Sequence, residues 1–187
     1  MSLFIGVEGG ATNTIVCIYD ASGLELGRAS GVGTNQYLCG MDAVCATLIS
    51  LTLEAMGNAK LVVPVAGGGR VPLVPLFAAF GACMSGMAEA APQAELETLL
   101  RVTAPWLSAH YYLENDSLGS IYSAAGGAGG CVIIAGTGSI AQLVTGEGKL
   151  LSVGGHGHMY GDGEKGAERE RSTSECMREV LARSVAW

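Results

Sequence analysis

The chain has 187 residues, enough for one well-buried domain or a domain with an appended piece. Its 49% hydrophobic and 14% charged residues exclude a disordered chain. The net charge of −7 disfavours nucleic acids and anionic membranes as partners. The six cysteines form no Cys-x-x-Cys pair and lie mostly in apolar segments, which predicts reduced thiols in the cytoplasm.

The N-terminal part predicts a three-stranded antiparallel meander followed by a helix. Two apolar runs, residues 4–8 and 14–19, flank a glycine turn, and residues 24–29 follow a second turn. Apolar residues at helical spacing then predict an amphipathic helix over residues 41–56, which Gly57 is expected to end.

Strands and helices alternate in the middle of the chain. Residues 77–84 predict a buried strand, and Pro92 is suited to the first turn of the next helix. Residues 111–113 predict a strand, and residues 117–125 predict a short helix. A meander followed by this alternation predicts an α/β lobe with a mixed sheet flanked by helices.

Residues 130–139, Gly-Cys-Val-Ile-Ile-Ala-Gly-Thr-Gly-Ser, predict a strand that ends in a glycine turn, and a hairpin over residues 140–153 follows. Backbone N–H groups and hydroxyls in such a turn can bind phosphate, although an ordinary hairpin turn is the alternative. The pattern Gly136-x-Gly138-x-x-Ala141 formally fits a dinucleotide-binding motif. That motif must open a helix, whereas a strand is predicted here.

Another glycine turn lies earlier in the chain, at residues 9–14, with the sequence Gly-Gly-Ala-Thr-Asn-Thr. Two small-residue turns with hydroxyls favour a phosphate cradle more than one does. The candidate phosphate-binding residues are Gly9, Gly10, Thr12 and Asn13 in the first turn and Gly136, Thr137, Gly138 and Ser139 in the second.

Two carboxylates lie at predicted strand ends. Asp116 follows one strand and precedes a helix, where a general base for an alcohol can act, with an ordinary helix N-cap as the alternative. Glu8, beside the first glycine turn, could hold Mg²⁺ through water, with a solvated carboxylate as the alternative. Asn35 and Asp162 are either polar contacts to a sugar or turn residues.

Six short motifs occur in the order seen in the N-acetylglucosamine kinases. They are Gly6-Val7-Glu8-Gly9-Gly10-Ala11-Thr12, Thr34-Asn35-Gln36, Met84-Ser85-Gly86, Asn115-Asp116-Ser117-Leu118-Gly119-Ser120, Gly136-Thr137-Gly138-Ser139 and Gly154-Gly155-His156-Gly157-His158-Met159-Tyr160-Gly161-Asp162. Over residues 4–162 the chain therefore resembles that family, in the sugar-kinase branch of the actin, hexokinase and heat-shock ATPase superfamily.

The resemblance implies a ribonuclease-H-like lobe, ATP and Mg²⁺ as cofactors, and phosphorylation of the 6-hydroxyl of N-acetyl-D-glucosamine. It makes the two glycine turns the phosphate loops and Asp116 the base that accepts the hydroxyl proton. The implied sugar contacts are Asn35, Ser85, Asp116, Gly155, His156 and Asp162. His156 stands where the family usually has Trp.

From residue 163 onward the likeness stops and the composition becomes more charged. We therefore expect residues 1–162 to form an N-terminal kinase lobe and residues 163–187 to be a divergent tail, from truncation or a frame shift, with the second lobe absent. Such a chain is expected to be inactive or strongly impaired. A non-catalytic sugar-binding or regulatory pseudokinase is the alternative function, and a homodimer is left open.

Overall fold

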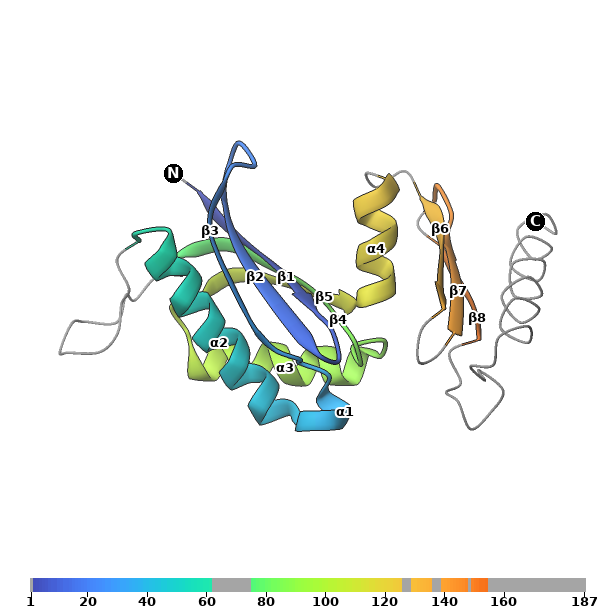
Figure 1. Cartoon of the computed structure of the whole chain (residues 1–187), viewed down its shortest axis with the longest axis horizontal. Coiled ribbons are helices and arrows are strands. Elements are labelled where there is room, and N and C mark those ends of the chain that lie inside the picture. Colours follow the sequence, from blue (N-terminus) through green and yellow to red (C-terminus); the bar gives the residue numbers. More distant parts are fainter. Residues whose placement is uncertain (1, 62–74, 126–128, 136–138, 148, 155–187) are drawn as a thin grey trace. The chain divides into compact units, whose positions relative to one another are not determined.

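The computed structural model describes residues 2–61, 75–125, 129–135, 139–147 and 149–154 (Figure 1). The chain divides into two compact units, Met1–Asp116 and Ser117–Trp187.

The first unit is built on a five-stranded mixed sheet. Its strands are β1 (Leu3–Gly9), β2 (Asn13–Asp20), β3 (Glu25–Val32), β4 (Phe77–Met84) and β5 (Ser108–Asn115), in the order β3-β2-β1-β4-β5 (Figure 1). β1, β2 and β3 pair antiparallel, which confirms the predicted meander, and β4 and β5 run parallel to β1. The carboxyl ends of β1, β4 and β5 therefore meet at one end of the sheet.

Two helices, α2 (Met41–Asn58) and α3 (Ala90–Thr103), cover one face of this sheet (Figure 1). Period-two burial along β2 directs Val16 and Ile18 into the core beneath them. Leu48 from α2 is also fully buried, and burying a leucine side chain stabilises the fold by about 2 kcal/mol. A further short helix, α1 (Gln36–Cys39), was not predicted from the sequence.

The prediction that Gly57 ends the long helix was wrong. α2 continues to Asn58, and Lys60 adopts the left-handed conformation with φ 55°. The N–H of Lys60 donates to the Gly57 carbonyl at 3.0 Å, and the N–H of Leu61 donates to the Met56 carbonyl at 2.9 Å. These are the two hydrogen bonds of a Schellman motif. The helix therefore ends at Asn58, two residues later than predicted.

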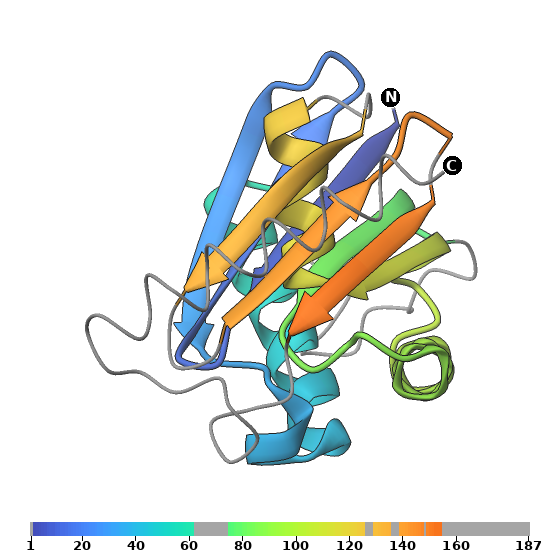
Figure 2. The same ribbon diagram turned by 90° about the vertical axis from the view of Figure 1, so that its right-hand side faces the viewer.

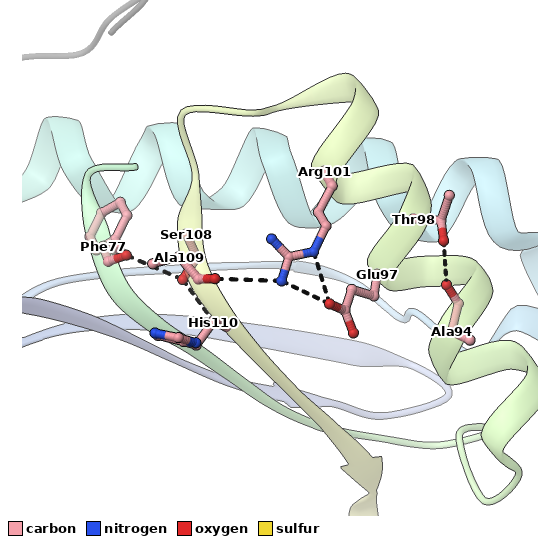
Figure 3. A network of polar contacts seen from close by, with 8 residues as sticks. All are labelled: Phe77, Ala94, Glu97, Thr98, Arg101, Ser108, Ala109 and His110. Carbon is pink, nitrogen blue, oxygen red and sulfur yellow. Dashed lines mark hydrogen bonds and ion pairs between the residues drawn. The ribbon is translucent and has the colours of Figure 1, made fainter. Parts of the chain in front are cut away.

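The outer edge of β5 is partly covered by an arginine from α3 (Figure 3). Arg101 Nε donates to Glu97 Oε1 at 2.8 Å, and Arg101 Nη2 donates to the Ala109 carbonyl at 3.4 Å. The guanidinium also lies 4.7 Å from the Tyr111 ring centroid. Because the ion pair is exposed, it contributes at most about 1 kcal/mol. The arginine thus covers part of β5, which is an edge strand of the sheet.

The second unit contains most of α4 (Asp116–Ala125) and a three-stranded antiparallel sheet. Figure 2 shows β6 (Gly130–Ala135), β7 (Ser139–Val144) and β8 (Leu150–Gly154) side by side in that order. This confirms the predicted strand and hairpin. A strand, not a helix, follows residues 136–138, so the dinucleotide-binding alternative fails. Among the described residues of this unit, the buried apolar ones are Leu118, Ile121, Ala141 and Val144.

The predicted strand over residues 77–84 is β4, and Pro92 lies in the first turn of α3 as expected. No helix in the described part of the chain is both long and apolar enough to cross a membrane. Residues 61–74 are rich in Gly and Pro, which predicts a loop, and all of them except Leu61 lie outside the described residues, as does the tail over residues 163–187.

Candidate active site

The first glycine turn, residues 9–13, joins β1 to β2 and is fixed from both sides. The N–H of Gly10 donates to the Asn13 carbonyl at 2.8 Å, which closes the turn. The N–H of Thr34 donates to the Gly10 carbonyl at 3.0 Å, and the N–H of Ser85 donates to the Gly9 carbonyl at 2.7 Å. Residues 11–13 at the tip are exposed. The turn therefore presents its tip to solvent while neighbouring segments hold its base.

Beneath the turn lies a buried pair of hydroxyls. The Oγ1 atoms of Thr14 and Thr34 are 2.9 Å apart, and both residues are fully buried. Thr34 Oγ1 also lies 3.8 Å from Met84 Sδ. Buried hydroxyls need hydrogen-bond partners, and here each serves the other. The pair joins the start of β2 to the segment that follows β3.

Asn35 caps the short helix α1. Its side-chain Oδ1 accepts a hydrogen bond from the Tyr37 N–H at 3.0 Å. This contact fits the alternative that Asn35 is a turn residue. It uses only one lone pair of the side-chain oxygen, however, and the side-chain amide also has two N–H donors that could contact a sugar. The next side chain, Gln36, donates from Nε2 to the Gly86 carbonyl at 2.7 Å. Asn35 is thereby held close to the end of β4.

Gly86 explains why the motif Met84-Ser85-Gly86 ends in glycine. Its φ is +86°, a conformation that residues with a side chain rarely adopt. A Cβ atom there would also lie 2.9 Å from Asn35 Oδ1 and 3.2 Å from Tyr37 Cδ2. Only glycine allows the residue 35–37 segment to pack this closely.

Ser85 and Asp116 are in direct contact. The Ser85 hydroxyl donates to Asp116 Oδ2 at 2.6 Å, a short bond of the kind formed to charged acceptors. Ser85 follows β4 and Asp116 follows β5. Because these strands are parallel neighbours, they bring the two side chains to the same end of the sheet. Asp116 is the first residue of α4 and half-buried, which confirms its predicted position between a strand and a helix.

The thiol of Cys83 lies near this end of the sheet. Burial raises its pKa, and the carboxylates of Glu114 and Asp116 raise the pKa further. The thiol therefore stays protonated at neutral pH and is a poor nucleophile.

Glu8 is exposed in β1, where it lies between Ile15 and Cys83 in the pairing register. Within the described residues, no cluster of three or more His, Cys, Asp or Glu could hold a metal ion. Mg²⁺ often binds through one carboxylate, substrate phosphates and water, so a single carboxylate fits that mode of binding. The role of Glu8 stays a prediction.

Several predicted site residues belong to the second unit. Gly136, Thr137, Gly138, Gly155, His156 and Asp162 lie outside the described residues, and Ser139 is the first residue of β7. In the described part of this unit, the buried Gln142 accepts a hydrogen bond from the Ser117 hydroxyl and donates to Ser152 Oγ at 3.0 Å. These bonds link α4, β7 and β8.

Sequence reasoning missed three residues that organise the first unit's site, namely Thr34, Gln36 and Gly86. All three stand in the quoted motifs, next to Asn35 or Ser85, but no role was assigned to them. The glycine after Ser85 was the available signal, because an isolated glycine after a strand often marks a close backbone approach.

No protein-family model matches the chain. Among solved structures, it is similar to a proposed N-acetylglucosamine kinase from Chromobacterium violaceum, with a TM-score of 0.68 and 26% identity over 84% of this chain and 50% of that one. A second proposed N-acetylglucosamine kinase, from Porphyromonas gingivalis, has a TM-score of 0.63 and 24% identity over 87% and 50%. A ROK family glucokinase from Streptomyces griseus, solved with glucose and AMPPNP, has a TM-score of 0.51 and 16% identity over 80% and 46%.

The chain spans about half the length of these solved structures. The resemblance predicted from six short motifs is confirmed by the fold. The chain has the actin-like ATPase fold of sugar kinases, and it resembles the N-terminal lobe of the N-acetylglucosamine kinases.

Proposed function

We propose that this chain carries the sugar-binding and phosphate-binding groups of an ATP-dependent kinase that phosphorylates the 6-hydroxyl of N-acetylglucosamine. The observation that supports this proposal is the convergence of Asn35, Ser85, Asp116 and the glycine turn at one end of the five-stranded sheet. Hydrogen bonds connect all four, through Ser85 to Asp116 and to Gly9, and through the residue 34–36 segment to Gly10 and Gly86.

In the proposed reaction, Asp116 accepts the proton of the sugar hydroxyl as its oxygen attacks the γ-phosphorus of ATP. The bond between that phosphorus and the β-γ bridging oxygen breaks, and ADP leaves. Ser85 orients the carboxylate by donating to Oδ2. A positioned base of this kind typically contributes a factor of about 10² to 10⁴ to the rate.

The exposed glycine turn would bind phosphate oxygens through the backbone N–H groups and the Thr12 hydroxyl. Mg²⁺ near Glu8 would neutralise charge on those oxygens. The second phosphate loop is proposed at residues 136–139. Further sugar contacts are proposed at Asn35, Gly155, His156 and Asp162.

Binding is the first readout for this proposal, because phosphoryl transfer usually requires two lobes that close and exclude water. The 187 residues taken alone are expected to give little turnover. Calorimetric titration of the purified chain with N-acetylglucosamine should detect a complex. Absence of any sugar binding at millimolar concentration would overturn the proposal.

Asn35→Asp tests the sugar contact without removing the helix cap, since Asp caps helices as well as Asn does. The variant keeps the oxygen that accepts from Tyr37 and loses the two N–H donors. We expect sugar affinity to fall about fivefold, with an unchanged urea midpoint, because a hydrogen bond contributes about 1 kcal/mol. Equal affinity in both proteins would remove Asn35 from the site.

Titration with MgATP separates the kinase from the non-catalytic alternative. Sugar binding with no nucleotide binding would favour a sugar-binding pseudokinase. Any ATP-dependent formation of sugar phosphate should be lost in Asp116→Asn, and undiminished turnover in that variant would contradict the base assignment. Efficient turnover by the unaltered chain would instead contradict the expectation of an impaired enzyme.

A further inference from the structure

Three short segments at the site end of the sheet form a closed ring of hydrogen bonds. The segments are residues 9–10, 34–36 and 85–86. The Thr34 N–H donates to the Gly10 carbonyl at 3.0 Å, and the Ser85 N–H donates to the Gly9 carbonyl at 2.7 Å. The Gln36 side chain closes the circle by donating to the Gly86 carbonyl at 2.7 Å. We call this closed set of contacts the hydrogen-bond ring.

The hydrogen-bond ring touches each group that the proposed function uses. It includes the base of the glycine turn at residues 9–13, which is proposed to bind phosphate, and its middle segment contains Asn35. Ser85, in its third segment, donates the 2.6 Å hydrogen bond to Asp116. Two of its three hydrogen bonds are between backbone groups. The third comes from the side chain of Gln36, so it is the one that a substitution can remove cleanly.

We propose that Gln36 is a positioning residue, which fixes Asn35 against the end of β4 and links the sugar-binding groups to the phosphate turn. This inference rests on the proposed function for its ligand. Gln36 itself need not touch the sugar. The close packing of Asn35 and Tyr37 against Gly86 makes the link stiff, because the left-handed Gly86 leaves no space between the two segments.

The test compares Gln36→Met with a matched control, Asn58→Leu. Gln36→Met keeps an unbranched side chain of similar length and removes the N–H donor without adding charge. Asn58 makes the same type of bond, from Nδ2 to the Arg28 carbonyl at 2.8 Å, and lies at the far end of α2 from α1. Each variant thus loses one amide-to-carbonyl bond, and only Gln36→Met opens the hydrogen-bond ring.

Amide hydrogen exchange of the ligand-free chain tests whether the hydrogen bonds of the ring depend on one another. In Gln36→Met, exchange at Thr34 and Ser85 should accelerate about fivefold, because one hydrogen bond no longer opposes local opening. Neither amide bonds to Gln36, so a change there reports transmission around the ring. Asn58→Leu should leave both rates unchanged. Unchanged rates in Gln36→Met would overturn the proposal.

Calorimetric titration with N-acetylglucosamine tests the positioning role. Sugar affinity should fall about fivefold in Gln36→Met and stay within error in Asn58→Leu at matched stability. Equal affinities in the two variants would overturn the role. Should the unaltered chain bind no sugar, the proposed function fails, whereas the exchange rates still decide whether the hydrogen-bond ring exists as one unit.

Discussion

The two turns at opposite ends of β2 reverse the chain by different means. The turn at residues 20–24 is held by its own side chain, because Asp20 Oδ1 accepts from the Ser22 N–H at 2.8 Å, the Ser22 hydroxyl at 2.6 Å and the Leu24 N–H at 3.1 Å. The turn at residues 9–13 is closed by one backbone hydrogen bond of its own, and its base is also held by Thr34 and Ser85, which come from distant parts of the chain.

This difference fits the proposal that the turn at residues 9–13 binds phosphate and the turn at residues 20–24 only reverses the chain. A turn that satisfies its own backbone groups has fewer donors left for an anion. The tips of both turns, residues 11–13 and residues 21–24, are exposed, so the two turns differ in what holds them and not in exposure. Four substitutions test the comparison.

The largest effect is expected from Gly33→Ala. A Cβ atom there would collide with the Ala11 carbonyl and lie 2.7 Å from the Thr12 nitrogen. Both are backbone atoms of the glycine turn at residues 9–13. We expect a loss of about 3 kcal/mol in the free energy of unfolding, measured by urea titration. Gly57→Ala is the control, since nothing lies within 4 Å of the added atom. That helical change should stabilise the chain by about 0.5 kcal/mol.

Thr34→Val should cost about 1 to 2 kcal/mol, because it leaves the buried Thr14 hydroxyl without the acceptor and donor it now has in Thr34. The double variant Thr14→Val/Thr34→Val should lose less than the sum of the two single variants, since no polar group is then left unsatisfied. Additive losses in urea titrations would mean that the two hydroxyls do not depend on each other.

Asp20→Asn should produce a smaller effect that depends on pH. Hydrogen bonds, first from the Ser22 hydroxyl and then from backbone N–H groups, hold the pKa of Asp20 below its ordinary value. The folded state therefore gains stability from the ionised carboxylate at pH values above the unfolded pKa of about 3.9, and it loses that gain as pH falls through the lower folded pKa. Urea midpoints of the two proteins should differ at pH 6 and converge near pH 2. A difference that is constant with pH would contradict the assignment.

The smallest effect is expected from Ser22→Ala, which removes the hydroxyl donor and keeps the backbone one. The pKa of Asp20 should rise toward its ordinary value, as followed by NMR titration of the carboxyl carbon. The glycine turn at the other end of β2 should keep its amide exchange rates. A change there would mean that the two turns are coupled after all.

Local patterns predicted the elements that local physics determines. The helix at residues 41–56 was predicted because its apolar spacing is periodic over several turns, and the strand at residues 77–84 because it is a short, unbroken apolar run. α1 was missed because four residues carry no period, and its start depends on the Asn35 cap. Gly57 was misread because a left-handed Lys60 ended the helix instead, and that choice depends on the hydrogen bonds formed after the helix.

The site was predictable to a similar degree. Asp116 could be placed at a strand end from the sequence pattern, and Asn35 was a candidate sugar contact with a turn residue as the alternative, whereas Ser85 was selected by resemblance to known kinases. The contacts of Gln36 with Gly86 and of Thr34 with Gly10 join segments whose relative register no single-sequence pattern encodes. The residues that organise the site were therefore visible in the motifs, but their partners were not.

The order in which the chain folds follows from the pairing of β1 with β4. Gly9 lies opposite Met84 in that parallel register, so the hydrogen-bond ring cannot close until two strands far apart in sequence have met. The meander and α2 involve nearer neighbours and can form earlier, since closing a long loop delays distant contacts. The segments proposed to bind ligands are thus expected to assemble late and to open first under mild denaturant, and a bound sugar would protect the least stable part of the sheet.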